Sequence, residues 1–78
     1  MNSASKNLCG SIIARLRAQQ SPEITQEALA AKVQRQGVEL DRVAIAKIET
    51  QKRRVSDFEV VAIAKALKVS PLTLLGCE

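Results

Sequence analysis

The basic side chains of this chain are concentrated in one short stretch, residues 41–54. The 78-residue chain has 12 lysines and arginines against 8 acidic residues, a net charge of +4. Residues 41–54 alone have a net charge of +3, whereas residues 55–78 have a net charge of −1. The basic residues of the stretch are Arg42, Lys47, Lys52, Arg53 and Arg54. Concentrated positive charge is typical of a surface that binds phosphate, although a solvated face of a small basic protein has the same composition.

Two of these basic residues fall on a helix that we predict from Asp41 to about Thr50. Asp41 can cap its start, and Ala44, Ile45 and Ile48 recur at helical spacing on an inward face. The outward face then holds Arg42, Val43, Ala46 and Lys47. Arginine can pair with guanine, a valine methyl can rest on a thymine methyl, and lysine can reach guanine or phosphate. We therefore predict that Arg42, Val43 and Lys47 contact bases, with solvated charges and partial core packing of Val43 as the alternatives.

Phosphate contacts are predicted on either side of this helix. Thr25 can cap a preceding helix that extends to about Gln36, and Gly37 fits a left-handed position after it. Gln26, at the start of that helix, can bind a phosphate together with the free backbone donors, or it can be a plain polar residue. On the other side, we predict phosphate contacts from Lys52, Arg53 and Arg54; Arg54 could instead neutralise Asp57 or Glu59.

Three further helices complete the predicted fold. The first runs from near Cys9 to Gln20, where Ser21-Pro22 breaks it. Ser56 and Glu59 form a capping box before the fourth, and Ser70-Pro71 opens a short fifth. In the fifth we expect Leu72 and Leu75 in the core, and Leu74 and Cys77 exposed, either as a dimer seam or at a frayed C-terminus. No segment alternates with period 2, so the sequence predicts an all-α fold, a compact five-helix bundle.

Composition argues against several other classes of protein. Residues 1–6 are expected to be a disordered or frayed tail before one domain at residues 7–76. Cys9 and Cys77 lie far apart without metal-ligand spacing, and we expect both to be free thiols. The chain has no histidine or tyrosine, so we expect no enzyme, no metal, no cofactor and no small-molecule ligand. The longest apolar run, Val60–Ala64, is too short to span a bilayer, which favours a cytoplasmic protein without a membrane partner.

Four ordered blocks resemble the Cro/repressor-type (XRE) helix-turn-helix family. They are Thr25–Ala30, Ile45–Glu49, Lys52–Arg54 and Ala62–Ser70, and the similarity runs from about Leu16 to Leu75. The resemblance implies a lambda-repressor-like DNA-binding domain whose third helix enters the major groove.

The resemblance also implies roles for individual residues. It makes Gln26 a phosphate contact, places Arg42, Val43 and Lys47 at base-facing positions, and turns the loop Gln51–Arg54 toward the DNA backbone. It makes Ala30 a small residue that allows close helix packing. It further implies a partly buried ion pair between Arg17 and Glu49.

The chain departs from the family pattern in two places. Gln26 and Ile45 are 19 positions apart, about five more than in a typical member. We therefore expect a longer second helix and a looser turn after it. Gln51 also occupies a position that often holds glycine in the family.

Together these features predict a sequence-specific regulator of transcription that binds double-stranded DNA, and we expect a repressor of bacterial or phage type. A homodimer on paired half-sites about one duplex turn apart is expected. The alternative is a protein-binding helical module, or an antitoxin-like partner protein, that keeps this fold with little or no DNA binding.

Overall fold

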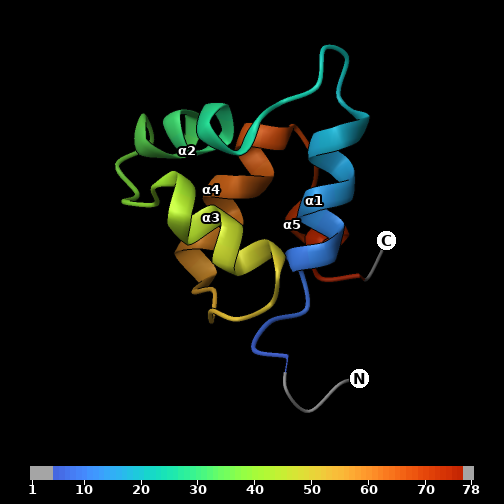
Figure 1. The fold of residues 1–78 in the computed structure, drawn as a ribbon, viewed down its shortest axis with the longest axis vertical. Helices are drawn as coiled ribbons and strands as arrows, with labels where there is room; N and C mark the ends of the chain where they lie inside the picture. Colours follow the sequence, from blue (N-terminus) through green and yellow to red (C-terminus); the bar gives the residue numbers. More distant parts are fainter. Residues whose placement is uncertain (1–4, 77–78) are drawn as a thin grey trace.

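The computed structural model describes residues 5–76, and within this range the chain folds into five α-helices without a strand (Figure 1). The helices are α1 (Gly10–Gln19), α2 (Gln26–Gln34), α3 (Arg42–Glu49), α4 (Asp57–Leu67) and α5 (Pro71–Leu74). The predicted all-α five-helix architecture is therefore confirmed. No helix in the described range is long and apolar enough to cross a membrane.

Side-chain caps determine where four of the helices begin. The side chains of Thr25, Asp41, Ser56 and Ser70 each accept a hydrogen bond from a backbone N–H in the first turn of the helix that follows. At α4 the capping box is complete, because the Glu59 side chain accepts in return from the Ser56 amide. Each cap stabilises its helix by about 1 kcal/mol, because the first N–H groups of a helix have no partner within it.

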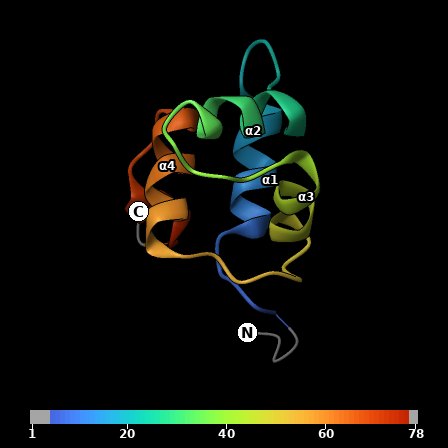
Figure 2. The ribbon, with the colours of Figure 1, turned by 90° about the vertical axis from the view of Figure 1, so that its left-hand side faces the viewer.

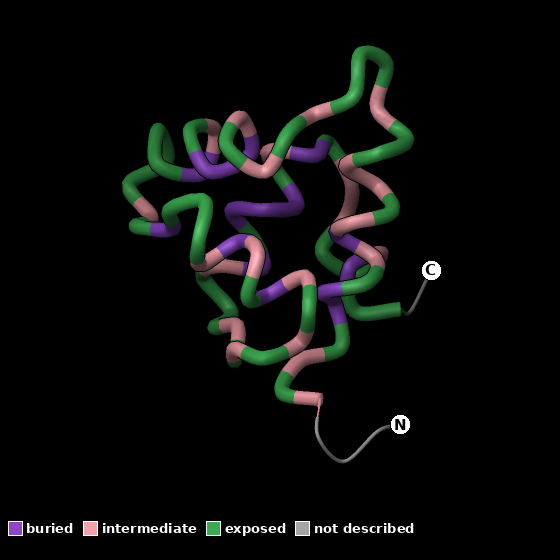
Figure 3. Tube along the Cα trace, in the orientation of Figure 1, coloured by how far each residue is buried: buried purple, intermediate pink, exposed green. Residues whose placement is uncertain are grey.

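All five helices contribute to a single core. Helix α2 packs on both α3 and α4, α1 packs on α3, and α5 packs on α4. Figure 2 shows α2 bridging the space between α3 and α4. The buried stretches of the trace in Figure 3 accordingly face the middle of the molecule. The largest side chains in this core are Ile13, Leu29, Leu40, Ile45, Ile48, Ile63, Leu67 and Leu74.

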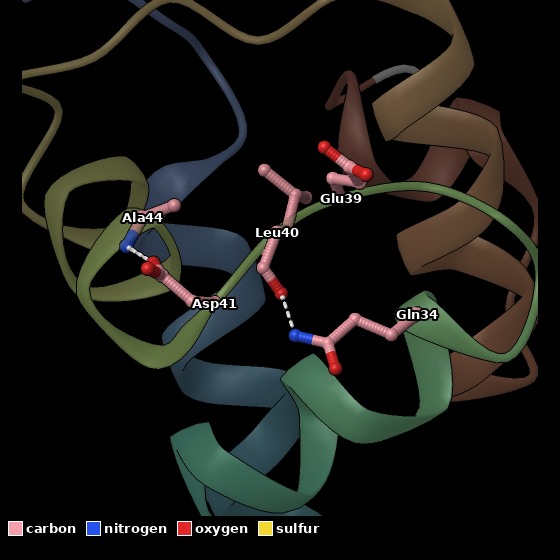
Figure 4. A pocket seen from close by; sticks show the side chains of 5 residues that line it. All are labelled: Gln34, Glu39, Leu40, Asp41 and Ala44. Carbon is pink, nitrogen blue, oxygen red and sulfur yellow. Dashed lines mark hydrogen bonds between the residues drawn. The ribbon is translucent and has the colours of Figure 1, made fainter.

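The connection between α2 and α3 differs from the predicted longer helix. Helix α2 ends at Gln34, two residues before the expected end, and the amides of Gln36 and Gly37 donate instead to carbonyls three residues earlier, in a tighter turn. Gly37 (φ +83°) turns the chain, and Leu40 then inserts into the core. The Gln34 side-chain amide donates to the Leu40 carbonyl at 2.9 Å beside an open hollow (Figure 4). The residues that this chain has beyond a typical family member between Gln26 and Ile45 therefore form a turn and an extended segment. Leu40 anchors that segment in the core.

The leucines in and directly after α5 are buried and exposed in the opposite way to the prediction. Leu74 is fully buried, whereas Leu72 and Leu75 are 52% and 41% exposed. A helix of four residues presents only one position squarely to the helix that it packs on, and here that position is Leu74. The expectation that Leu72 and Leu75 lie in the core was wrong.

One of the two cysteines expected to be free thiols lies within the described residues. Cys9 is buried and free, and burial raises the pKa of its thiol above the ordinary value. Cys77 lies outside the described residues.

Gly10, at the start of α1, lies against the backbone of α3. A Cβ added there would overlap the Ile48 carbonyl oxygen at the end of α3. We predict that Gly10→Ala lowers the free energy of unfolding by about 1–3 kcal/mol, because the two helices must move apart. Urea denaturation followed by circular dichroism measures the change. Ser11→Ala, at the next and exposed position, is the control and should change stability by less than about 0.5 kcal/mol; equal effects of the two substitutions would contradict the close approach.

Candidate nucleic-acid interface

Helix α3 presents two basic side chains and one valine to solvent. Asp41 caps it through a hydrogen bond from the Ala44 amide at 2.7 Å, and Ile45 and Ile48 on its inner side are fully buried. The predicted base-contacting residues Arg42, Val43 and Lys47 are all exposed. Val43 is 48% exposed, so it lies outside the core.

The other end of α3 is joined to α1 by the ion pair that the family resemblance implies. The Arg17 guanidinium donates to both oxygens of the Glu49 carboxylate, at 2.8 and 2.9 Å. The two side chains are only 16% and 7% exposed. The hydrogen bonds to Glu49 raise the pKa of Arg17 above its ordinary value. Arg17 also donates to the Ile24 carbonyl at 3.1 Å, which ties the loop before α2 to the same group.

Gln26, the predicted phosphate contact at the start of α2, is held by the same carboxylate. Its side-chain amide donates to Glu49 Oε1 at 2.9 Å. An amide nitrogen carries two hydrogens, so one N–H remains for a further acceptor. Glu49 therefore positions the start of α2 against the end of α3 and fixes the orientation of Gln26.

The loop after α3 leaves the helix through a left-handed residue. Gln51 has φ +63°, the backbone region that glycine favours. Its amide donates to the Ile48 carbonyl and the Lys52 amide donates to the Lys47 carbonyl, both at 2.9 Å. This is a Schellman motif, which satisfies the last carbonyls of a helix. Gln51 thus keeps the conformation expected of glycine at this family position.

Two residues from the start of the chain fix this loop. The Asn7 side chain donates to the carbonyls of Ile48 and Arg53, at 3.1 and 2.7 Å, and accepts from the Gly10 amide at 2.8 Å. Lys6 lies in the tail that was expected to be disordered or frayed, of which residues 1–4 lie outside the described range. Its backbone amide donates to the Gln51 carbonyl at 3.0 Å.

Sequence reasoning did not single out Lys6 or Asn7, because both act more than forty positions away along the chain. The only local signal was an asparagine three residues before the first residue of a helix, a spacing at which its side chain can accept from that helix.

The basic residues of the loop have different surroundings. Lys52 and Arg54 are exposed, whereas Arg53 is half-buried. Arg53, rather than Arg54, neutralises Glu59: its guanidinium donates to both carboxylate oxygens, at 2.9 and 3.1 Å. Lys6 joins the three residues around one open hollow at the start of α4. The structure thus gathers a basic cluster, which we define as Lys6, Lys52, Arg53 and Arg54.

Within the described part of the chain, no group of three histidine, cysteine or acidic side chains is close enough to hold a metal ion.

Comparison with known families gives one match. A helix-turn-helix family model matches residues 13–74, which run from within α1 to the end of α5. No curated protein and no solved structure matches the chain.

The Arg17–Glu49 pair gives a prediction about stability. Arg17→Met would leave an almost buried carboxylate without its cation, so we expect the free energy of unfolding to fall by about 3 kcal/mol. The double variant Arg17→Met/Glu49→Met removes both charges and should recover most of that loss. Urea denaturation of the two variants and the wild type tests this. A double variant no more stable than Arg17→Met would show that the unpaired carboxylate is not the cause.

The Arg53–Glu59 pair gives a prediction about pH. The hydrogen bonds from Arg53, helped by the Ser56 amide, hold the pKa of Glu59 below its ordinary value of 4.5. The unfolded chain therefore takes up this proton at a higher pH than the folded chain does. The contribution of the pair is complete above pH 4.5 and is lost as the pH falls through the folded-state pKa. Between about pH 5 and pH 3, stability should fall more steeply in the wild type than in Glu59→Gln; parallel curves from chemical denaturation would refute this.

Proposed function

Because the chain belongs to the Cro/repressor-type (XRE) family of helix-turn-helix DNA-binding regulators, we propose that it recognises a specific duplex sequence with α3. The observation that carries this proposal is the exposed face of α3, whose three outward residues are able to contact base edges. Three residues of the basic cluster follow directly after that helix, where backbone phosphates flank a groove.

We assign base recognition to Arg42, Val43 and Lys47. The Asp41 cap fixes the end of α3 that carries Arg42 and Val43, and Glu49 fixes the other end. A helix held at both ends can present a guanidinium to guanine without a large loss of freedom on binding. This rigidity supports direct readout of bases by α3.

We assign phosphate contacts to Gln26, Lys52, Arg53 and Arg54, and add Lys6 to them. Gln26 would use the amide hydrogen that Glu49 leaves free. Lys52 and Arg54 are exposed and ready to bind, while Arg53 would contact phosphate only with the N–H groups that Glu59 and the Arg54 carbonyl leave free. The Asn7 hydrogen bonds hold the loop in place, which favours contacts that set the register of α3 in the groove.

We further propose that the chain is a repressor of bacterial or phage type that works in the cytoplasm, as a homodimer on paired half-sites. A protein that occupies the major groove with high affinity excludes other proteins from that segment of DNA. Two copies on half-sites about one duplex turn apart bind the same face of the duplex. We expect no catalytic activity, since the proposed DNA-binding residues include no nucleophile paired with a base.

One observation favours the alternative of a protein-binding module. Several large apolar side chains on α4 and α5 are exposed, and they lie outside the residues assigned to DNA. The basic and polar outward face of α3 favours DNA as the principal partner.

Substitution of Arg42 tests the assignment of base contacts. We predict that Arg42→Ala weakens binding to the preferred duplex by about 1–3 kcal/mol and changes binding to random duplex much less. Fluorescence anisotropy with both duplexes measures the difference. Equal losses on the two duplexes would mean that Arg42 reads no base.

Substitution of Lys52 tests the assignment of phosphate contacts. Lys52→Ala should weaken binding to both duplexes alike and lower the slope of log K against log salt by about one charge. A titration repeated at several salt concentrations gives the slope. Arg15→Ala, which removes an exposed arginine of α1 that is not assigned to DNA, is the control and should leave the slope unchanged; the same slope in Lys52→Ala and wild type would remove Lys52 from the interface.

A further inference from the structure

The only aromatic side chain of the chain lies on its surface. Phe58 is 78% exposed, and Val61, one turn further along α4, is 41% exposed. Leu72 of α5 and Leu75, directly after it, are exposed as well. A large apolar side chain that is not needed in the core is a frequent anchor of protein interfaces.

The exposed side of α4 is a narrow strip in which acidic, apolar and basic side chains follow one another regularly. Four residues form it, and we call them the α4 face: Asp57, Phe58, Val61 and Lys65. Asp57, Val61 and Lys65 follow one another at intervals of four residues, so they lie in a row along the helix. Val61 is in the middle of the row. Along the helix axis, Asp57 lies about 6 Å before Val61 and Lys65 lies about 6 Å after it.

We propose that the α4 face docks on the α4 face of a second copy of this chain, antiparallel and around a twofold axis near Val61. Asp57 of each copy then faces Lys65 of the other, and the two Val61 side chains meet at the centre. Phe58 of each copy covers the apolar part of the partner helix. This inference rests on the proposed homodimer and identifies its surface.

The order of charges favours a second copy over an unrelated protein. In an antiparallel pair of identical helices, the acidic end of each row meets the basic end of the other row. In a parallel pair, Asp57 would face Asp57 and Lys65 would face Lys65, so like charges would meet. Such self-matching is what a twofold interface requires, since each contact occurs twice. Binding of an unrelated protein would not require residues 57 and 65 to carry opposite charges at equal distances from Val61.

The surroundings of the α4 face also fit this arrangement. A shallow groove lies on each side: one includes Val38 and Ala62, and the other includes Val55, Pro71 and Leu75. Phe58 of one copy can therefore rest in a groove of the other while the two Val61 side chains meet on the twofold axis.

Docking there leaves the DNA-reading helix free. The α4 face contains none of the exposed residues of α3, and Figure 2 shows the two helices on opposite sides of the view. One copy can thus bind DNA and a second copy at the same time. Because the apolar area is small, the dimer should be weak without DNA.

Exchange of the two charges tests the proposal with the full chain in the absence of DNA. Asp57→Lys and Lys65→Asp each replace two attractions across the twofold axis by two repulsions. We expect each to raise the dissociation constant for self-association about tenfold. The double variant Asp57→Lys/Lys65→Asp restores the match and should return to within about threefold of the wild type. Sedimentation equilibrium between about 10 µM and 1 mM measures all four proteins.

Two controls separate docking from folding. Asp57 accepts from the Phe58 amide in the first turn of α4, so its loss destabilises the helix slightly. Glu27→Lys makes the matched change in the first turn of α2 and should leave self-association unchanged. Phe58→Ala should keep the urea midpoint of the wild type, because this side chain is largely exposed, and should raise the dissociation constant at least about tenfold.

A wild type that stays monomeric throughout this range would overturn the proposal. So would a folded double variant that associates no better than the single variants, which is the result expected if another protein covers this face. Neither result bears on DNA reading by α3, because anisotropy with a single half-site reports that binding separately.

Discussion

The carboxylate of Glu49 must be neutralised, because a nearly buried charge without a partner is costly. Arg17 supplies the opposite charge from α1, and Gln26 supplies a further N–H from α2. One acidic group therefore couples the two helices of the helix-turn-helix unit to each other and to α1. The direction in which α3 faces solvent follows from that coupling. The residues proposed to read bases and the residue proposed to set the first phosphate contact are positioned by the same group.

A second constraint acts just beyond α3. Gln51 takes a left-handed backbone, and Asn7 joins the start of α1 to the end of α3 and to the loop. Gly10 permits the close approach that this joining needs. The basic cluster is thus built on a fixed loop and carries a lysine, Lys6, from a distant part of the sequence. A rigid relation between phosphate-binding and base-reading residues is what allows backbone contacts to set the register of specific ones.

The parts of this structure that depend on neighbouring residues could be predicted from the sequence. Caps at Thr25, Asp41 and Ser56 involve residues three positions apart, and helical spacing identified the buried Ile45 and Ile48. What escaped prediction depends on contacts between distant segments or on very short elements. Those features are the role of Asn7, the pairing of Arg53 rather than Arg54 with Glu59, the end of α2 at Gln34, and the burial of Leu74 in place of Leu72 and Leu75.

The central claim is that α3 reads a specific duplex sequence. Selection of bound sequences from a pool of random duplexes tests it most directly, because no operator needs to be known beforehand. We expect an enriched motif with two symmetric half-sites whose centres are about one duplex turn apart. In Arg42→Ala the selected motif should lose sequence preference at the base pair that Arg42 contacts in each half-site, while the preference at the other positions and the binding of DNA by the protein persist. A pool that binds without enrichment of any sequence would contradict the claim.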